Sequence, residues 1–149
     1  MRIWKEVVDG VEVEVMEFDD TVETVEKASR LSGYPRTLIV KTLLLKVGER
    51  YLAAVVRGDR RVDLNKAEKV FGKRVSLARP NEVRSILGVD VGAVTPISAR
   101  VKSLQVVLDP AIATQEFVVC GSGSLNRLYQ VRVQDLLNYL KPMLLDIFK

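Results

Sequence analysis

One apolar segment, residues 38–47, constrains the fold more than any other part of the sequence, because it reads as a buried strand built around a lysine. Alternate side chains of a strand share a face, so Lys41 lies in line with Ile39, Leu43 and Leu45 on a face that should be core. An ammonium group is costly to bury unless something pairs with it. Lys41 therefore either extends its stem to the sheet edge or awaits an anionic or carbonyl-bearing ligand.

The same segment begins a predicted hairpin, because a short turn at Gly48 separates it from the apolar residues 51–57. The remaining pattern predicts helices and strands that are interspersed, with several strands joined directly to one another. We expect strands over 11–15, 75–78, 101–108, 116–120 and 128–133, helices over 20–33, 63–71 and 80–88, and a loop over 91–96; residues 1–8 could be a short helix or a strand. This order predicts an α+β fold with helices packed on a mixed sheet, in one domain over 1–149.

The end of the chain predicts an amphipathic helix from about residue 134. Its apolar stripe comprises Leu136, Leu140, Met143 or Leu144, and Ile147. Such a stripe packs into the core of this chain, or else it forms a dimer seam or a docking face for a partner.

The composition excludes several classes of enzyme. The chain has no histidine and one cysteine, which removes the Ser-His-Asp and Cys-His catalytic schemes and the common zinc sites. An enzyme built from these residues must use lysine, carboxylates, backbone amides or groups of its substrate. The net charge of +4 is compatible with a polyanionic partner such as RNA. The absence of a long apolar run and of a signal peptide predicts a cytoplasmic protein with no membrane partner.

Two loops are further candidates for a functional site. The segment from Gly92 to Pro96 has a glycine that could bring the backbone close to a ligand and a proline that would hold the turn rigid. Exposed amides in such a loop can stabilise negative charge on a carbonyl oxygen. The segment 121–124, Gly-Ser-Gly-Ser, lies between two strands and predicts a hairpin turn, and Cys120 before it predicts a small core residue.

Taken in order, these segments resemble the YbaK/ProX family of aminoacyl-tRNA deacylases, whose domain also occurs as the editing insertion of bacterial prolyl-tRNA synthetases. The resemblance covers about residues 11–140. It rests on the segments Val-Lys-Thr-Leu-Leu at 40–44, Val-Asp-Leu-Asn-Lys at 62–66, Leu-Gly at 87–88, Val-Gly-Ala-Val-Thr-Pro at 91–96, Val-Leu-Asp at 107–109 and Cys-Gly at 120–121. The family fold that it implies is a mixed, partly closed β-sheet with helices outside.

The resemblance implies hydrolysis of the ester that joins a wrong amino acid to a transfer RNA, without metal or cofactor. The substrate would be a mischarged tRNA, with tRNA(Pro) carrying Cys or Ala as the leading expectation, and prolyl-tRNA synthetase a possible partner. Lys41 and the amides of Gly92 and Ala93 would act on the ester, and the nucleophile would be water or a substrate group. The residues expected to bind the substrate are Thr42, Val94, Thr95, Pro96, Cys120 and Gly121. The chain departs from the cysteine-type enzymes near Met16 and at Cys120, so the amino acid removed is not carried over.

Five basic residues are candidates for contacts with the tRNA backbone, each of which could equally be ordinary surface charge: Arg57, Arg60, Arg61, Arg100 and Lys102. An alternative function is a module of the same fold that binds tRNA or a synthetase without turnover. The protein would be a monomer or a homodimer.

Overall fold

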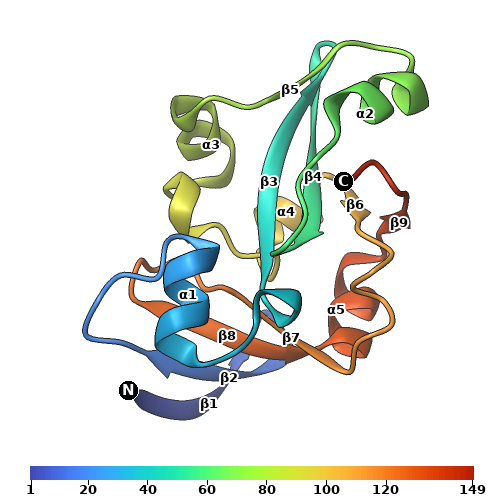
Figure 1. Cartoon of the computed structure of the whole chain (residues 1–149). Coiled ribbons are helices and arrows are strands. Elements are labelled where there is room, and N and C mark those ends of the chain that lie inside the picture. The colour runs from blue at the N-terminus through green and yellow to red at the C-terminus, as the bar shows by residue number, and fades with distance from the viewer.

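The computed structural model describes residues 1–149 and contains two β-sheets that are joined at the base of one hairpin (Figure 1). The antiparallel four-stranded sheet has the order β1 (Arg2–Val8), β2 (Val11–Glu17), β8 (Arg127–Arg132) and β7 (Phe117–Gly121). The mixed five-stranded sheet has the order β5 (Val75–Leu77), β3 (Val40–Val47), β4 (Arg50–Arg57), β6 (Gln105–Leu108) and β9 (Met143–Leu144). A single parallel bridge between Ile39 and Val119 connects the two sheets. The predicted α+β class is confirmed, with the partly closed sheet present as two sheets that share this bridge.

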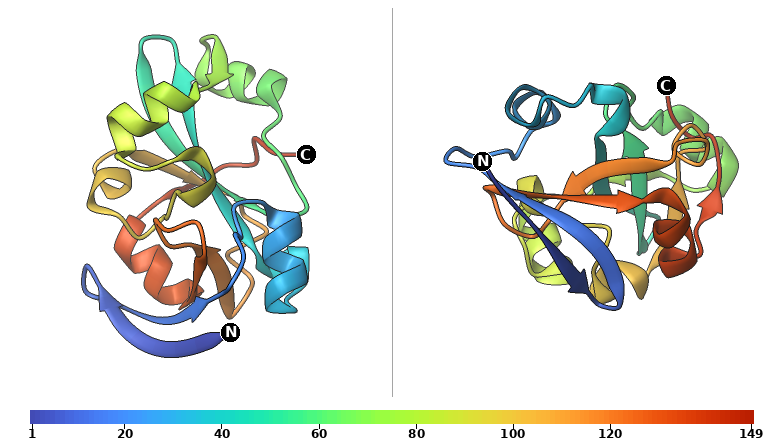
Figure 2. Two further views of the ribbon diagram at one scale, coloured as in Figure 1. Left: turned by 90° about the vertical axis from the view of Figure 1, so that its left-hand side faces the viewer. Right: turned by 90° about the horizontal axis from the view of Figure 1, so that it is seen from below.

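Five α-helices pack on these sheets: α1 (Val25–Ser32), α2 (Leu64–Phe71), α3 (Pro80–Leu87), α4 (Ala99–Lys102) and α5 (Val133–Leu140). Two 3₁₀ turns, η1 (Arg36–Leu38) and η2 (Val91–Ala93), lie before β3 and before α4. Helices α1 and α5 lie on opposite sides of the four-stranded sheet (Figure 2), because Met16 and Val15 of β2 point to opposite faces and pack with different clusters. No helix is long and apolar enough to cross a membrane.

The β3–β4 hairpin has a hydrophobic cluster on each face. Its strands pair from Val40 with Arg57 to Val47 with Arg50, around the turn at Gly48, as predicted. One face packs with β2, α3, α4 and α5, and the other is covered by α2 and the C-terminal residues. A hairpin buried on both faces explains why segment 38–47 is almost continuously apolar.

The turn residues explain where several elements begin and end. Asp9 and Gly10 both have positive φ, which suits a two-residue hairpin turn, and residues 2–8 form a strand. The Asp63 side chain accepts hydrogen bonds from the first amides of α2, as predicted.

Helix α1 begins later than the predicted residue 20, because the Thr24 hydroxyl caps it by accepting from Lys27 N–H at 3.1 Å. Asp20 caps only its own turn, by accepting from Thr21 N–H.

Two sequence predictions near the C-terminus are wrong. The strand predicted over 101–108 begins only at Gln105, since Ser98 caps the short helix α4. The last helix ends at Leu140, because Lys141 has a positive φ of 48° that a helix cannot contain. Ile147 is therefore buried by the returning chain and not by a helix stripe. The predicted stripe does not exist as one continuous helical face.

A buried carboxylate fixes the returning C-terminus. Asp109 is fully buried and accepts hydrogen bonds from Arg60 Nη1 at 2.6 Å and from the amides of Arg57 and Ala111. The same guanidinium donates to Asp146 Oδ1 at 2.9 Å and to the carbonyl of Phe148 at 3.1 Å. Arg60 thus links the β4–α2 loop, the segment after β6 and the end of the chain.

We expect Asp109→Ala to lower the free energy of unfolding by about 3 kcal/mol, because it removes one partner from a buried ion pair. Asp146→Ala removes the exposed partner of the same arginine and should lower it by less than about 1 kcal/mol. Urea denaturation of the two variants measures the difference. Equal losses would show that Arg60 stabilises the fold without the buried carboxylate.

Candidate active site around Lys41

A cavity of about 320 Å³ opens where β3 and β7 separate beyond the Ile39–Val119 bridge. Its walls come from the start of β3, the end of β7, the start of α1 with the residues before it, and the loop at η2. Helix α1 stands beside the base of β3 (Figure 1). Six of the predicted site residues line this cavity: Lys41, Thr42, Gly92, Val94, Cys120 and Gly121. We call it the Lys41 cavity.

Lys41 is half-buried and makes no hydrogen bond or ion pair within the chain. It shares its strand face with Leu43 and Leu45 and lies opposite Val56 of β4. Loss of water around the ammonium lowers the pKa of Lys41 below its ordinary value of 10.5. The cavity therefore holds a positive charge that the protein itself does not neutralise.

Thr42 contributes unsatisfied polar groups beside this charge. It is buried, and its hydroxyl oxygen has no hydrogen-bond partner. The backbone carbonyl of Leu44 accepts from Ala78, which lies on the side of β3 away from β4. Since backbone groups alternate along a strand, the amide and carbonyl of Thr42 point to this same side, where β3 has no strand neighbour until Leu45 pairs with Leu77. Thr42 thus brings to the cavity wall a buried hydroxyl without a partner and backbone groups on the open edge of β3.

Glu23 also lines the cavity and was missed by the sequence analysis. Its Oε1 atom accepts from Lys27 Nζ at 2.8 Å, and this hydrogen bond is the main reason that the pKa of Glu23 lies at about 2. Its Oε2 atom is buried and has no partner. The sequence placed residue 23 in the first turn of a helix, where an acidic residue needs no further explanation. The late start of α1 at Val25 is what turns Glu23 toward the cavity wall.

Two glycines allow the walls to approach closely. A β-carbon at Gly92 would lie 2.6 Å from Cβ of Glu23, and one at Gly121 would lie 2.2 Å from the carbonyl oxygen of Val94. Both positions are closed to any larger residue without movement of the neighbouring segment. The hairpin after β7 is held to the same loop, because Gly123 N–H donates to the Ala93 carbonyl at 2.8 Å. The cavity is therefore framed by backbone in fixed positions.

Three predicted site residues have other roles. Ala93 N–H already donates to the Asp90 carbonyl at 2.9 Å, so this amide does not face a substrate as predicted. Thr95 and Pro96 do not line the cavity. The Thr95 hydroxyl accepts from Ile97 N–H and Pro96 is buried, so both shape the loop and not the pocket. The 3₁₀ turn η2, which the sequence did not reveal, causes this: it turns Ala93 inward.

Cys120 lines the cavity as a wall. It is buried, and burial raises the pKa of its thiol to about 12. A thiol that stays protonated is a poor nucleophile.

The predicted tRNA-binding residues do not form one group. Arg57 is the last residue of β4, and Arg60 and Arg61 follow it. Arg100 and Lys102 precede β6, which runs parallel to β4, so they lie toward the other end of β4. Arg57 pairs across the hairpin with Val40, next to the Lys41 cavity, and its guanidinium binds Asp59. Arg60 is held by Asp109, and Lys102 lies over the ring of Tyr139. Among these residues, Arg57 is the one that pairs directly with a residue of the cavity wall, Val40.

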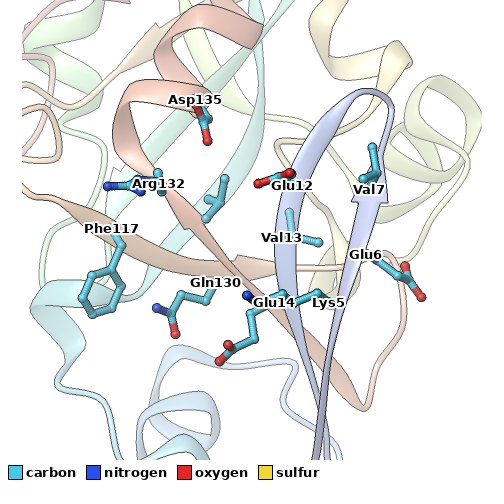
Figure 3. A pocket seen from close by; sticks show the side chains of 11 residues that line it. Lys5, Glu6, Val7, Glu12, Val13, Glu14, Phe117, Gln130, Arg132 and Asp135 are labelled. Atoms are coloured by element: carbon cyan, nitrogen blue, oxygen red, sulfur yellow. The ribbon is translucent and has the colours of Figure 1, made fainter.

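A second depression, of about 440 Å³, lies on the open face of β1, β2 and β8 (Figure 3). Figure 3 shows the carboxylates of Glu12, Glu14 and Asp135 around it, together with Arg132. None of its side chains has a buried polar atom without a partner. Its size alone does not make it a site, and the Lys41 cavity carries the chemistry.

Comparison with known proteins gives a family for this geometry. Residues 19–139 match the family model described as "Aminoacyl-tRNA editing domain". The proline–tRNA ligase of Bacillus cytotoxicus is 33% identical over 102 residues, which are 68% of this chain and 18% of that protein. The chain thus spans about a fifth of the length of this relative. The uncharacterized protein YwhH of Bacillus subtilis is 29% identical over 126 residues, covering 84% of this chain and 80% of that one.

Among solved structures, a candidate trans-editing enzyme for prolyl tRNA synthetase superposes with a TM-score of 0.82 at 26% identity, covering 92% of this chain and 87% of that chain. The matched region contains the whole Lys41 cavity, from Val22 to Leu128. The resemblance seen in the sequence is therefore confirmed: the chain belongs to the aminoacyl-tRNA editing domain family.

Proposed function

We propose that this chain acts in trans on a mischarged tRNA, removing a small non-cognate amino acid such as Cys or Ala from tRNA(Pro). The observation that carries the proposal is the unpaired ammonium of Lys41 in a cavity of about 320 Å³. A positive charge held without a partner inside a protein suits a ligand that supplies the negative charge or carbonyl dipole. The names of the relatives support tRNA(Pro), since they include a proline–tRNA ligase and a candidate trans-editing enzyme for its synthetase.

In the proposed reaction the terminal adenosine of the tRNA brings its aminoacyl ester beside Lys41. The ammonium holds the ester carbonyl or the last phosphate as a compact charge with three donors. Water adds to the carbonyl carbon, and the oxyanion that forms accepts hydrogen bonds from backbone amides. Gly92 and Thr42 are the residues that offer such amides to the cavity, in place of Ala93. The carbonyl then re-forms as the bond from its carbon to the ribose oxygen breaks, and the ribose oxygen takes up the proton that the attacking water has lost, so that the free amino acid and the uncharged tRNA are released.

The residues around the cavity leave the activation of water to the substrate. A carboxylate with a pKa of about 2, such as Glu23, is a weak base near neutral pH. The Cys120 thiol stays protonated. A ribose hydroxyl or a side-chain group of the amino acid can direct the water instead, in a site that mainly positions the reactants.

Size selects the amino acid in this proposal. Apolar side chains make up most of the walls, among them Val22, Val25, Leu43 and Val94. Pockets of this kind separate amino acids that differ by a methylene about ten- to two-hundredfold. The tRNA body would pass the group that follows β4, where Arg57 and Arg61 lie at the same end of the hairpin as Lys41. A prolyl-tRNA synthetase could deliver the tRNA in the cytoplasm.

We expect Lys41→Ala to slow deacylation about a hundred- to thousandfold, as loss of a group that stabilises the oxyanion does in other enzymes. The assay is loss of Cys, Ala, Ser or Pro from charged tRNA(Pro), and of amino acids from several cognate pairs, with EDTA present. Lys46→Ala, on the same strand but outside the cavity, is the matched control and should keep the wild-type rate. Binding of tRNA with no loss of any ester from wild type would favour the binding-module alternative.

Lys41→Met should make the protein more stable at pH 7 while it slows deacylation as much as Lys41→Ala does. The charged lysine loses hydration only in the folded state, so its pKa is lowered there, and folding is penalised as long as the group is protonated. The penalty falls as the pH rises from the lowered pKa toward 10.5. Urea midpoints of wild type and Lys41→Met at pH 7 and pH 10 should therefore converge at the higher pH. A constant difference would mean that packing, and not charge, separates the two proteins.

Gly121→Ala should lower the free energy of unfolding by about 1–3 kcal/mol, because the new methyl group overlaps the Val94 carbonyl. Displacement of that loop by about 1 Å should also lower the deacylation rate about a hundredfold. The control is Gly123→Ala in the same hairpin, where a β-carbon meets no atom within 4 Å and only the positive φ is strained. That variant should lose about 1 kcal/mol of stability and little activity. Equal deacylation rates for Gly121→Ala and Gly123→Ala would show that the close approach of Gly121 to Val94 does not control activity.

A further inference from the structure

Two buried acceptor oxygens without partners lie in the walls of the Lys41 cavity. Three buried side-chain nitrogen or oxygen atoms in the structure have no hydrogen-bond partner: Glu23 Oε2, Thr42 Oγ1 and Gln115 Oε1. The first two belong to residues that line the same cavity: Glu23 lies in the segment before α1, and Thr42 lies on β3. Buried polar atoms are almost always satisfied in folded proteins, so the coincidence points to a ligand that satisfies them.

The character of these atoms restricts that ligand. A carboxylate oxygen can only accept hydrogen bonds, and it attracts positive charge. The Thr42 hydroxyl can accept as well. Lys27 neutralises the other oxygen of Glu23 but does not reach Oε2. A cationic donor with more than one N–H group fits the pair.

The rest of the cavity has the opposite polarity, since Lys41 presents an unpaired ammonium. A ligand that matches both ends must carry a cationic donor and, close to it, a carbonyl or anionic group. An aminoacyl ester has this pattern: an α-ammonium group one carbon away from the ester carbonyl, with a phosphate beyond the ribose.

We propose that Glu23 and Thr42 bind the α-ammonium group of the aminoacyl ester, while Lys41 takes its carbonyl or phosphate, so that the enzyme reads the free amino group of its substrate. This inference rests on the function proposed above and adds the residues that bind the α-ammonium group of the substrate. Specificity then has two parts. The apolar walls select the substrate's amino-acid side chain by size, and the Glu23 carboxylate selects an amino acid whose α-amino group is free.

The position of Glu23 is fixed from several sides. Lys27 holds Oε1 and also donates to the Thr21 hydroxyl at 3.2 Å, which ties the segment before α1 to the helix. Gly92 packs against Cβ of Glu23 so closely that no β-carbon fits between them. A carboxylate placed so firmly, with one oxygen left free, is prepared for its ligand before the ligand arrives.

The test uses the ester that wild type removes fastest from the panel, and the same tRNA after N-acetylation of its amino acid. Both are measured under single-turnover conditions with wild type, Glu23→Gln and Glu26→Gln. Glu26 is the matched control, because it lies in the first turn of α1, is exposed, and does not line the cavity.

We expect wild type to hydrolyse the free-amine ester at least about tenfold faster than the acetylated one, since a charged hydrogen bond lost from a buried partner is worth this much or more. Glu23→Gln should lose that preference by slowing only on the free-amine ester. Glu26→Gln should behave as wild type. Thr42→Val, which keeps the shape of the side chain, should reduce the preference in part and serves as the second variant if Glu23→Gln unfolds.

Each contrary result has a distinct meaning. Hydrolysis of both esters at equal rates by wild type, or a preference that survives in Glu23→Gln, would overturn the inference and leave the deacylase intact. A uniform slowing of both esters in Glu23→Gln would overturn it too, because a merely structural role predicts that outcome. Loss of no ester by wild type would overturn the proposed function itself.

Discussion

The single bridge between Ile39 and Val119 is the constraint on which the structure depends. Two strands from different sheets run parallel there, pair once and then separate. Beyond the bridge the two sheets still share a core on one side, and the Lys41 cavity lies between the start of β3 and the end of β7. The start of α1 and the η2 loop close this space from outside. The cavity is thus a consequence of joining two sheets at one point, and not an indentation added to a finished surface.

The arrangement places charges where a core would otherwise be. Lys41 follows the bridge by two residues on a hairpin that is buried on both faces further along. Its neighbours in the strand are held by nonpolar packing, so the lysine cannot leave without breaking the hairpin register. The favourable packing of the hairpin offsets the free-energy cost of the Lys41 ammonium, which has lost part of its hydration. Proteins commonly accept such a local penalty at sites where binding later removes it.

Much of this could be predicted from the sequence, and the failures have physical causes. The period of two in segment 38–47 located Lys41, and glycines and Asp63 located the ends of α2 and α3, since these are local signals. The position of Glu23 was not predictable in this way, because it depends on a one-turn difference in where α1 begins. The orientation of Ala93 depends on the 3₁₀ turn η2, which is too short to produce a hydrophobic period in the sequence. The buried partner of Arg60 could not be predicted from local sequence, because Asp109 is 49 residues away in the sequence.

The two close backbone approaches limit how a protein of this architecture can change its substrate. Gly121 lies against the Val94 carbonyl and Gly92 lies against Cβ of Glu23, so neither glycine can be exchanged for a larger residue unless its neighbour moves. Other parts of the wall are made of apolar side chains, among them Val25 and Leu43, which can be exchanged for larger or smaller residues. Divergence toward a new amino acid would therefore proceed through these side chains, with the glycine contacts kept as a fixed reference against which size is measured.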